Sequence, residues 1–255
     1  MTSADIATAR ADRRARYLSR VLGDDVFHQN QYALVLGELV AAGRQRWLDI
    51  GAGTRMHGGW VGPSVDALAS RTGFLVGCDF EVDHLRSNAS LDAALSADAN
   101  ILPFADGSFD VVTANMVVEH LRDPAAAFAE VRRVLAPGGV FIFVTPNRGD
   151  PVVFLASILL QRGVRSRLAT SMEKRAAEDV FPTFYRANTP AAIGAHAATA
   201  GLEVRDLRLF SSFPFARWPM FAVALECQWI RLLRAHALRG LRSNIVCCLG
   251  RAGER

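Results

Sequence analysis

The stretch that decides how the middle of this chain folds is Trp47-Leu48-Asp49-Ile50-Gly51-Ala52-Gly53. Residues 46–50 form a short, mostly apolar run, which predicts a buried strand. Gly51 and Gly53 then let the backbone turn tightly and let a ligand come close to the main chain. One glycine-rich turn is weak evidence for a ligand site. The prediction of a ligand site therefore depends on the acidic residues that follow the turn along the chain.

Two later strand ends also carry carboxylates. Leu75-Val76-Gly77-Cys78-Asp79 predicts a second strand, and the Asp79 carboxylate can accept hydrogen bonds from both hydroxyls of a ribose. A third strand precedes Asp98, whose carboxylate could receive an adenine amino group. Three strand-end features in this order indicate a cofactor that contains adenosine.

The pattern along the chain is an alternation of strands and helices, which is typical of a parallel sheet covered on both faces. Asp123 and Pro124 predict the start of the helix before the fifth strand, as N-cap and first helical residue, and Pro137-Gly138-Gly139 predicts its end. Strands are expected at residues 46–50, 74–79, 94–97, 109–114, 139–144, 202–209 and 244–249.

Outside this core, helices are expected at residues 5–22 and 29–42, where they would cap the cofactor pocket. Residues 181–186 are aromatic and predict a loop, and Thr189-Pro190 predicts the start of a helix that runs to Ala200.

Two motifs in this region are Phe109-Asp110-Val111-Val112 and Glu119-His120-Leu121, and a helix and a strand follow at residues 130–141. With these features, residues 47–147 resemble the class I S-adenosylmethionine-dependent methyltransferases, in their small-molecule, type 11-like branch. The resemblance implies an α/β, Rossmann-like, seven-stranded sheet, mostly parallel with an antiparallel C-terminal hairpin and with helices on both faces.

The same resemblance implies one methyltransferase domain over residues 1–255. Its cap helices would lie in residues 1–44 and its cofactor-binding core in residues 45–147. Residues 148–255 would form the substrate side and the C-terminal hairpin region.

S-adenosylmethionine is the cofactor that the resemblance implies. Asp49 would orient the glycine turn through backbone amides, and the main chain of Gly51-Ala52-Gly53 would approach the methionine part. The other implied contacts are the ribose diol at Asp79, the adenine ring beside Phe80, the adenine edge at Asp98 and Ala99, and the methionine end at Asn115 and Met116.

Each of these residues also has a purely structural interpretation. Asp49 could be an acidic strand end, Asp79 the N-cap of the helix after Glu81, and Asp98 a turn residue facing solvent. Asn115 and Met116 could simply end the fourth strand. The chain departs from the family at Arg55, where a third glycine often stands, and a dinucleotide-binding Gly-x-Gly-x-x-Gly motif would require glycine in place of Met56.

His120 is the candidate catalytic residue. It follows the fourth strand, where substrate pockets open in such sheets, and an imidazole suits removal of a proton from the acceptor. The alternative is a structural, pocket-shaping role for the Glu119-His120 pair. Substrate contacts are expected from Tyr185, Arg186 and Asn147, with His28 as a further pocket candidate, although Arg186 could instead pair with Glu178 or Asp179.

Residues 213–233 form a second apolar feature, which could be core, a homodimer seam, or a helix lying on a membrane or over a lipid substrate. Arg217, Glu226 and Arg231 interrupt the run, which argues against a transmembrane helix. The apolar residues at helical spacing are Trp218, Phe221, Ala222, Leu225, Trp229, Leu232 and Leu233.

Composition narrows the functional classes. The 29 basic and 25 acidic residues give a net charge of only +4, so no nucleic-acid partner is expected. The four cysteines suit buried thiols, no metal-ligand spacing is found, and no signal peptide is recognised, so a cytoplasmic protein is expected, with a peripheral place at the inner face of the membrane as an option.

The expected function is therefore O-methylation of a small molecule, a glycan or a lipid-linked acceptor such as a glycolipid. The alternatives are an RNA or protein methyltransferase and a catalytically silent cofactor-binding scaffold. The end of the fourth strand lacks an Asn-Pro-Pro-aromatic motif, which argues against methylation of base amino groups.

Overall fold

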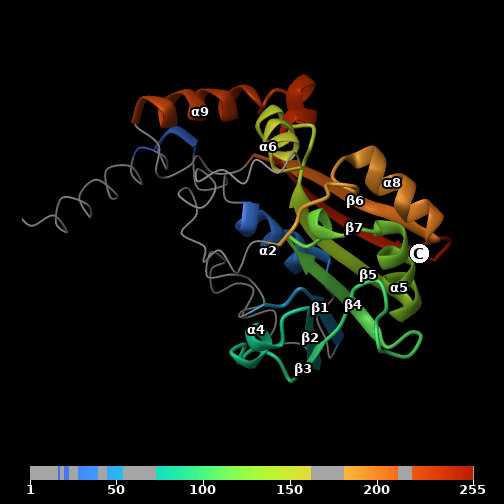
Figure 1. Cartoon of the computed structure of the whole chain (residues 1–255). Helices are drawn as coiled ribbons and strands as arrows, with labels where there is room; N and C mark the ends of the chain where they lie inside the picture. The colour runs from blue at the N-terminus through green and yellow to red at the C-terminus, as the bar shows by residue number, and fades with distance from the viewer. Residues whose placement is uncertain are drawn as a thin grey trace, which may run out of the picture.

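A seven-stranded sheet lies at the centre of the molecule, with the order β3-β2-β1-β4-β5-β7-β6 (Figure 1). The computed structural model describes residues 17, 20–22, 28–39, 45–53, 73–161, 181–211 and 220–254. The strands are β1 (Arg46–Ile50), β2 (Phe74–Asp79), β3 (Ala93–Ser96), β4 (Phe109–Asn115), β5 (Leu135–Pro146), β6 (Leu202–Phe210) and β7 (Asn244–Arg251).

The direction of the strands confirms the fold predicted from the sequence. β1 to β5 pair in parallel, whereas β7 runs antiparallel to both of its neighbours, β5 and β6. The carboxyl ends of β1, β2 and β4 therefore meet at the same edge of the sheet, where open α/β sheets bind their ligands.

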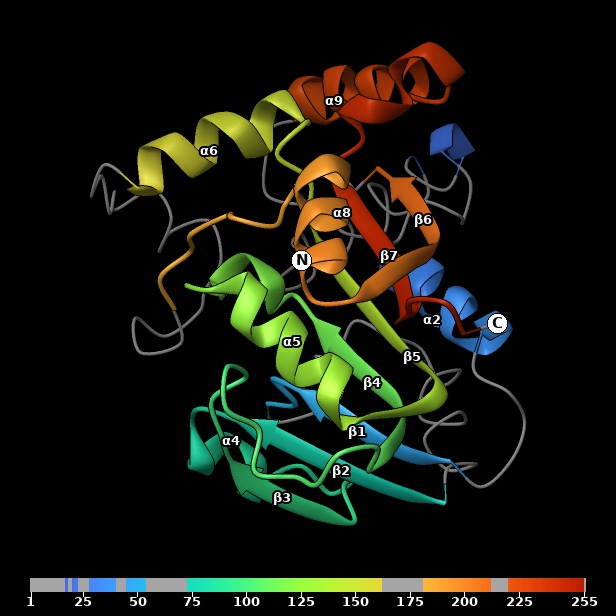
Figure 2. The ribbon, with the colours of Figure 1, turned by 90° about the vertical axis from the view of Figure 1, so that its right-hand side faces the viewer.

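Helices cover both faces of the sheet (Figure 2). α5 (Pro124–Val134) and α8 (Pro190–Thr199) pack on one face, where Phe128, Val131 and Ile193 join the buried cluster of that side. α2 (His28–Leu39) packs on the other face, against strand residues such as Trp47 and Ile142. Alternate residues of each strand thus feed two separate apolar clusters.

α2 packs on the sheet through one of its faces. Its Tyr32, Val35 and Leu36 are buried there, and the Tyr32 hydroxyl lies 3.4 Å from the Ile142 carbonyl oxygen. The role of α2 as a cap of the cofactor pocket stays a prediction. The helix predicted at residues 5–22 lies outside the described residues, apart from 17 and 20–22.

α5 begins as predicted and ends earlier. The Asp123 carboxylate accepts hydrogen bonds from the amides of Ala125 and Ala126, which confirms the N-cap. The helix stops at Val134, and Pro137-Gly138-Gly139 lies inside β5, opposite an irregularity where the register shifts between Phe109 and Val111. These residues make a bulge and do not end the helix, since Gly138 has φ of 75°.

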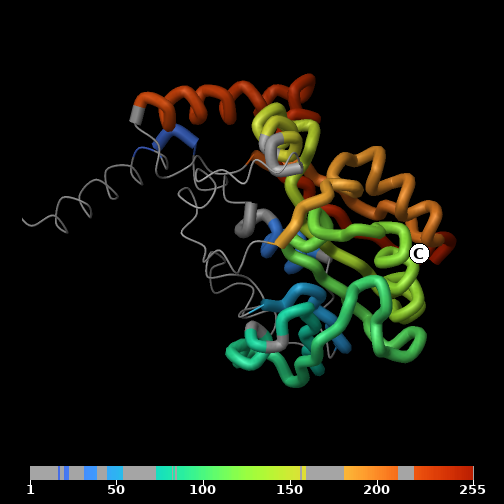
Figure 3. Tube along the Cα trace, viewed as in Figure 1, coloured from blue at the N-terminus to red at the C-terminus, as the bar shows by residue number. Residues whose placement is uncertain are grey.

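The remaining helices lie beyond the ends of the strands. α4 (Val82–Arg86) packs on β2 and β3, and the 3₁₀ helix η2 (Val118–His120) follows β4. α6 (Pro151–Gln161), α9 (Met220–Leu232) and the 3₁₀ helix η4 (His236–Leu241) stand off from the sheet at one end of the molecule (Figure 3). Every helix among the described residues is too short or too polar to span a bilayer.

Candidate cofactor and acceptor site

The glycine turn after β1 is held by the neighbouring strand. The amides of Gly51 and Ala52 donate to the carbonyl oxygen of Cys78, at 2.7 and 3.1 Å. Gly51 and Gly53 have φ of 71° and 52°, and a Cβ on Gly51 would collide with the Val117 side chain. Glycine is therefore needed at residue 51 both for the backbone conformation and for the space.

Asp79 joins the ends of β1 and β2. Its Oδ2 accepts the amide of Gly53 at 3.0 Å, and its Oδ1 accepts the amide of Glu81 at 3.0 Å. The Glu81 contact is the one that the structural interpretation of Asp79 predicts, whereas the Gly53 contact was not foreseen. A carboxylate has about four acceptor sites, so both bonds leave room for the hydroxyls of a ribose.

Asp49 does not contact the amides of the glycine turn, because these donate to Cys78 and Asp79. Its carboxyl group is 1% exposed and accepts the hydroxyl of Thr113 at 2.6 Å, while the Trp47 indole donates to the same hydroxyl oxygen at 2.8 Å. The predicted role of Asp49 in orienting the turn is wrong for this reason.

Burial dominates the chemistry of Asp49. It raises the pKa of the carboxyl to about 8, with a smaller increase from the Asp79 charge, and the Thr113 hydrogen bond opposes both. Oδ2 of Asp49 is buried and has no hydrogen-bond partner in the part of the chain that the structure describes. A buried oxygen of this kind fits a nearby ligand that can form a hydrogen bond with it.

The residues expected around adenine lie at the ends of β2 and β3. The Phe80 side chain is 71% exposed, so its ring is available to a ligand. Asp98 Oδ1 accepts the backbone amide and the side-chain amide of Asn100, both at 2.8 Å, which agrees with a turn role. Asn100 is thus a partner of Asp98 that sequence reasoning missed.

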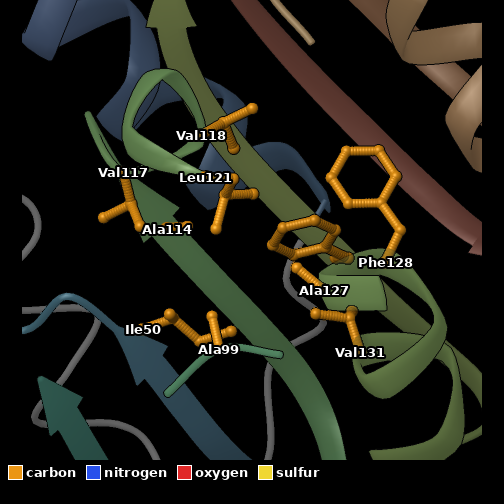
Figure 4. A pocket seen from close by; sticks show the side chains of 10 residues that line it. Ile50, Ala99, Ala114, Val117, Val118, Leu121, Ala127, Phe128 and Val131 are labelled. Carbon is orange, nitrogen blue, oxygen red and sulfur yellow. The ribbon is translucent and has the colours of Figure 1, made fainter. Parts of the chain in front are cut away.

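Ala99 lines a small apolar cavity under this edge of the sheet (Figure 4). The cavity has a volume of about 10 Å³ and lies among Ile50, Ala114, Phe128 and other apolar side chains. It has room for about one water molecule and no polar lining, so it cannot be the adenosine site. The predicted contact of Ala99 with adenine stays a prediction.

Asn115 and Met116 end β4 in an unusual backbone conformation. Met116 has φ of 57°, which a non-glycine residue adopts at a cost, and its amide donates to the Val144 carbonyl at 2.9 Å. Val117, the next residue, fills the space beside Gly51. The end of β4 and the glycine turn thus lie in contact, and their shared role at the methionine end stays a prediction.

His120 lies on η2, beyond β4. Its Nδ1 is 2.9 Å from the carbonyl oxygen of Pro182, and because a carbonyl can only accept, Nδ1 is the donor. In the neutral ring the lone pair is therefore on Nε2, which lies 4.0 Å from Oε1 of Glu119. The ring of Phe181 meets the imidazole edge-on.

The aromatic loop is fixed to η2 through Glu119. The Glu119 carbonyl accepts the amides of Phe184 and Tyr185, at 2.8 and 3.1 Å. Its buried side chain accepts the Thr145 hydroxyl at 2.9 Å, and the Thr145 oxygen in turn accepts the side-chain amide of Asn188 at 2.7 Å. The Glu119-His120 pair therefore has a structural role. His120 also keeps Nε2 as a ring nitrogen that can accept a proton.

The predicted substrate residues behave differently from one another. Asn147 is fully buried, and its side-chain amide donates to the carbonyls of Gly240 and Arg242, at 2.9 and 2.7 Å. Asn147 is therefore used to join β5 to η4, and its predicted substrate contact is wrong. Tyr185 is 9% exposed with φ of 52°, so most of its ring is within the protein.

Arg186 is exposed and its contacts are local. Its Nη1 donates to the Arg122 carbonyl at 2.6 Å, and its guanidinium lies over the Phe184 ring at 5.8 Å. The alternative partners Glu178 and Asp179 lie outside the described residues, as does the side chain of His28.

Comparison with known proteins identifies the central part of the chain. Residues 48–143 match the family described as a methyltransferase domain. The central part of the chain is therefore similar to a methyltransferase domain. The match includes the glycine turn, Asp79, Asp98 and His120, whereas Tyr185, Arg186 and α9 follow the matched region.

Individual relatives of this chain are also named as methyltransferases. A demethylmenaquinone methyltransferase of Mycobacterium sp. (strain KMS) is 34% identical over 147 residues, 56% of this chain and 59% of the relative. A malonyl-[acyl-carrier protein] O-methyltransferase of Erwinia pyrifoliae is 36% identical over 105 residues, 41% of this chain and 38% of the relative. The chain thus spans little more than half of the length of the first relative and less than half of the second.

A solved structure supports the fold. Geranyl diphosphate C-methyltransferase of Streptomyces coelicolor A3(2) superposes with a TM-score of 0.56 at 15% sequence identity. The likeness covers 87% of this chain and 80% of that one. It extends the similarity of fold well beyond the matched methyltransferase domain.

Sequence reasoning missed the contacts that hold the loop after β3 to α5. Arg133 of α5 donates to the carbonyls of Leu102 and Phe104, at 2.8 and 2.7 Å. Glu130, one turn earlier, accepts the Leu102 amide at 2.8 Å. The only sequence signal is a Glu-Arg pair three residues apart on a helix, which is common on helix surfaces.

Proposed function

We propose that this chain binds S-adenosylmethionine and transfers its methyl group to an oxygen of a small molecule, a glycan or a lipid-linked acceptor. The observation that carries the proposal is the Asp79 carboxylate, 3.0 Å from the Gly53 amide at the carboxyl edge of the sheet. This contact places a carboxylate that can accept hydrogen bonds from a ribose next to the glycine turn, within the region that matches a methyltransferase domain.

The residues present fit this cofactor. Asp79 and Phe80 would hold the ribose and adenine, and the main chain around Gly53 would take the methionine part, since a Cβ there would find its nearest neighbour at 3.9 Å. The buried Oδ2 of Asp49, which has no partner among the described residues, is a further polar atom available for a hydrogen bond to a ligand. When bound, the cofactor supplies an electrophilic methyl group on a sulfonium.

His120 would act on the acceptor. Its Nδ1 is engaged by Pro182, so Nε2 is the nitrogen that can take a hydroxyl proton. Holding the acceptor oxygen in line with the methyl group supplies a further part of the rate enhancement, through proximity and orientation. This division of roles requires no metal ion.

The proposed class of methyl acceptor is supported by the names of two relatives and by the end of β4. One relative is named as an O-methyltransferase that acts on malonyl-[acyl-carrier protein], and another as a methyltransferase of demethylmenaquinone. Both names favour a small or carrier-linked acceptor over RNA or protein. The end of β4, Asn115-Met116-Val117, also lacks the proline pair expected for methylation of base amino groups.

Calorimetric titration with S-adenosylmethionine and S-adenosylhomocysteine tests the cofactor site. Wild type should bind both compounds, and Asp79→Ala should bind at least about tenfold more weakly through loss of charge-assisted hydrogen bonds. Asp83→Ala is the matched control, because Asp83 is an exposed carboxylate of α4 that pairs only with Arg86 in the described region. A folded wild type that binds neither compound would support the scaffold alternative.

Methyl transfer is tested next with radiolabelled cofactor and hydroxylated small molecules, glycans and lipid-linked acceptors. His120→Ala should lower turnover by about 10²- to 10⁴-fold and leave cofactor affinity unchanged. Full turnover in this variant would show that the acceptor needs no base from His120.

A further inference from the structure

Exposed apolar side chains gather on two helices of this protein. Of the twelve large apolar side chains that are most exposed in the described region, six lie on α6 and α9. Single exposed apolar residues are ordinary on protein surfaces, whereas a group on neighbouring helices marks an interaction surface. The six are Val152, Phe154 and Leu155 of α6, and Phe221, Leu225 and Leu232 of α9.

α9 has two apolar faces. Val223, Cys227 and Ile230 are buried and pack against Leu22. Phe221, Leu225 and Leu232 lie on the opposite side, with exposed fractions of 71%, 69% and 58%. Phe221, Leu225 and Leu232 belong to the apolar face predicted from the sequence and face outwards. The buried face is a second set of residues that the prediction did not include.

α6 lies near one end of α9 and carries no charge (Figure 2). Its sequence, residues 151–161, contains no acidic or basic residue, and Val152, Phe154 and Leu155 are about half exposed. The hydrogen bonds of Asn147 to Gly240 and Arg242 fix the start of α6 beside η4. α6 and α9 thus extend from one junction at the end of β5, as both views show (Figures 1 and 2).

The charge around this junction is positive. Residues 220–242 contain Arg231, Arg234, Arg239 and Arg242 against Glu226 alone. Arg231 and Arg239 are exposed, at the end of α9 and on η4. An uncharged apolar surface bordered by arginines suits a layer of anionic lipid, in which acyl chains meet the apolar residues and phosphates meet the guanidinium groups.

A second copy of the chain fits this surface less well. A two-fold symmetric contact would bring together two copies of the same patch, both with a net positive charge. Charge complementarity therefore favours an anionic partner. The breadth of the apolar surface over two helices favours a lipid layer over a single acidic peptide.

We propose that α6 and the outer face of α9 form a docking surface for membranes that contain anionic phospholipid. α6 leaves the carboxyl end of β5, and the candidate cofactor site lies at the carboxyl ends of β1, β2 and β4. Docking would hold that site close to the bilayer surface. The docking surface is inferred from exposed residues of α6 and α9 alone, so it does not require the proposed methyl transfer.

Vesicle flotation of the whole chain tests the proposal, with phosphatidylcholine vesicles that either contain or lack phosphatidylglycerol. Phe221→Ser, Leu225→Ser and Leu232→Ser together remove the outer face of α9 without touching its buried face. The matched control changes three exposed apolar residues elsewhere, Leu34→Ser, Phe74→Ser and Val204→Ser. Circular dichroism on each protein establishes that it is folded.

Wild type and control should float with vesicles that contain phosphatidylglycerol, less so as salt is raised. The α9 variant should bind at least about tenfold more weakly, because each apolar side chain that enters the lipid layer contributes a large part of the affinity. Arg231→Gln with Arg239→Gln should remove the preference for phosphatidylglycerol.

Two outcomes would overturn the proposal. One is a folded wild type that floats with neither kind of vesicle. The other is a control that loses as much binding as the α9 variant. If sedimentation instead shows a wild-type dimer that the α9 variant converts to a monomer, without vesicle binding, the surface is a contact between copies and the membrane proposal is wrong.

Discussion

Replacing Asp49 with asparagine should change how the stability of the protein depends on pH. The Asp49 carboxyl is 1% exposed, one of its oxygens has no partner among the described residues, and burial raises its pKa to about 8. In the unfolded chain the same carboxyl would titrate near its ordinary value of 3.8. Between these two values the folded protein keeps a proton that the unfolded chain has released.

The sign and size of the effect follow from this difference. Because the folded state binds more protons, stability is fully present below the unfolded pKa and declines as pH rises towards 8. Each pH unit in this window costs about 1.4 kcal/mol, so from pH 5 to pH 8 the Asp49 contribution to the free energy of unfolding falls by about 4 kcal/mol. An asparagine side chain cannot ionise, so Asp49→Asn should lack this decline.

Urea unfolding of the cofactor-free protein at both pH values measures the effect. Any weakening of the Thr113 contact by the amide is independent of pH, so the comparison uses the change between pH values. Asp110→Asn is the control, because Asp110 lies near the start of β4, away from Asp49, and pairs with Arg46 on the surface. Parallel pH profiles for wild type and Asp49→Asn would refute a buried, protonated Asp49.

Three further predictions concern the turn, the core and the aromatic loop. Gly51→Ala should lower cofactor affinity and cost about 1–3 kcal/mol of stability, through positive φ and the clash with Val117, as measured by calorimetry and urea unfolding. Phe128→Ala, at a fully buried ring in α5, should cost about 3–5 kcal/mol in the same unfolding assay. Arg186→Ala should raise KM for an anionic acceptor and leave cofactor affinity unchanged, because Arg186 lies on the loop beside His120; an unchanged KM would assign Arg186 to loop structure alone.

Local patterns in the sequence predicted the strands and helix starts well. The run at residues 46–50, the Asp123 cap and the Thr189 cap each depend on neighbours within a few residues, and all three are confirmed. β3 differs from its prediction by one residue at each end. Such features follow from apolar spacing and hydrogen bonds within one turn.

Features that depend on distant partners were not predictable in this way. Asp49 is paired with Thr113, 64 residues further on, so no local pattern shows that its carboxyl is removed from the glycine turn. Asn147 is used by η4 and the residue that follows it, 93 and 95 residues away. The Pro137-Gly138-Gly139 run was misassigned for another reason: proline and glycine mark helix ends and strand bulges alike.

The place of β7 in the sheet has a consequence for synthesis of the protein. β7 pairs with β5 and β6 on its two sides, yet it begins only at Asn244, 98 residues after β5 ends at Pro146. At about 5–20 residues per second, a ribosome needs about 5–20 s to make the intervening chain. During that time the edge of β5 that β7 will occupy is open, so the nascent chain should be most vulnerable to aggregation, and most dependent on chaperones, shortly before β7 emerges.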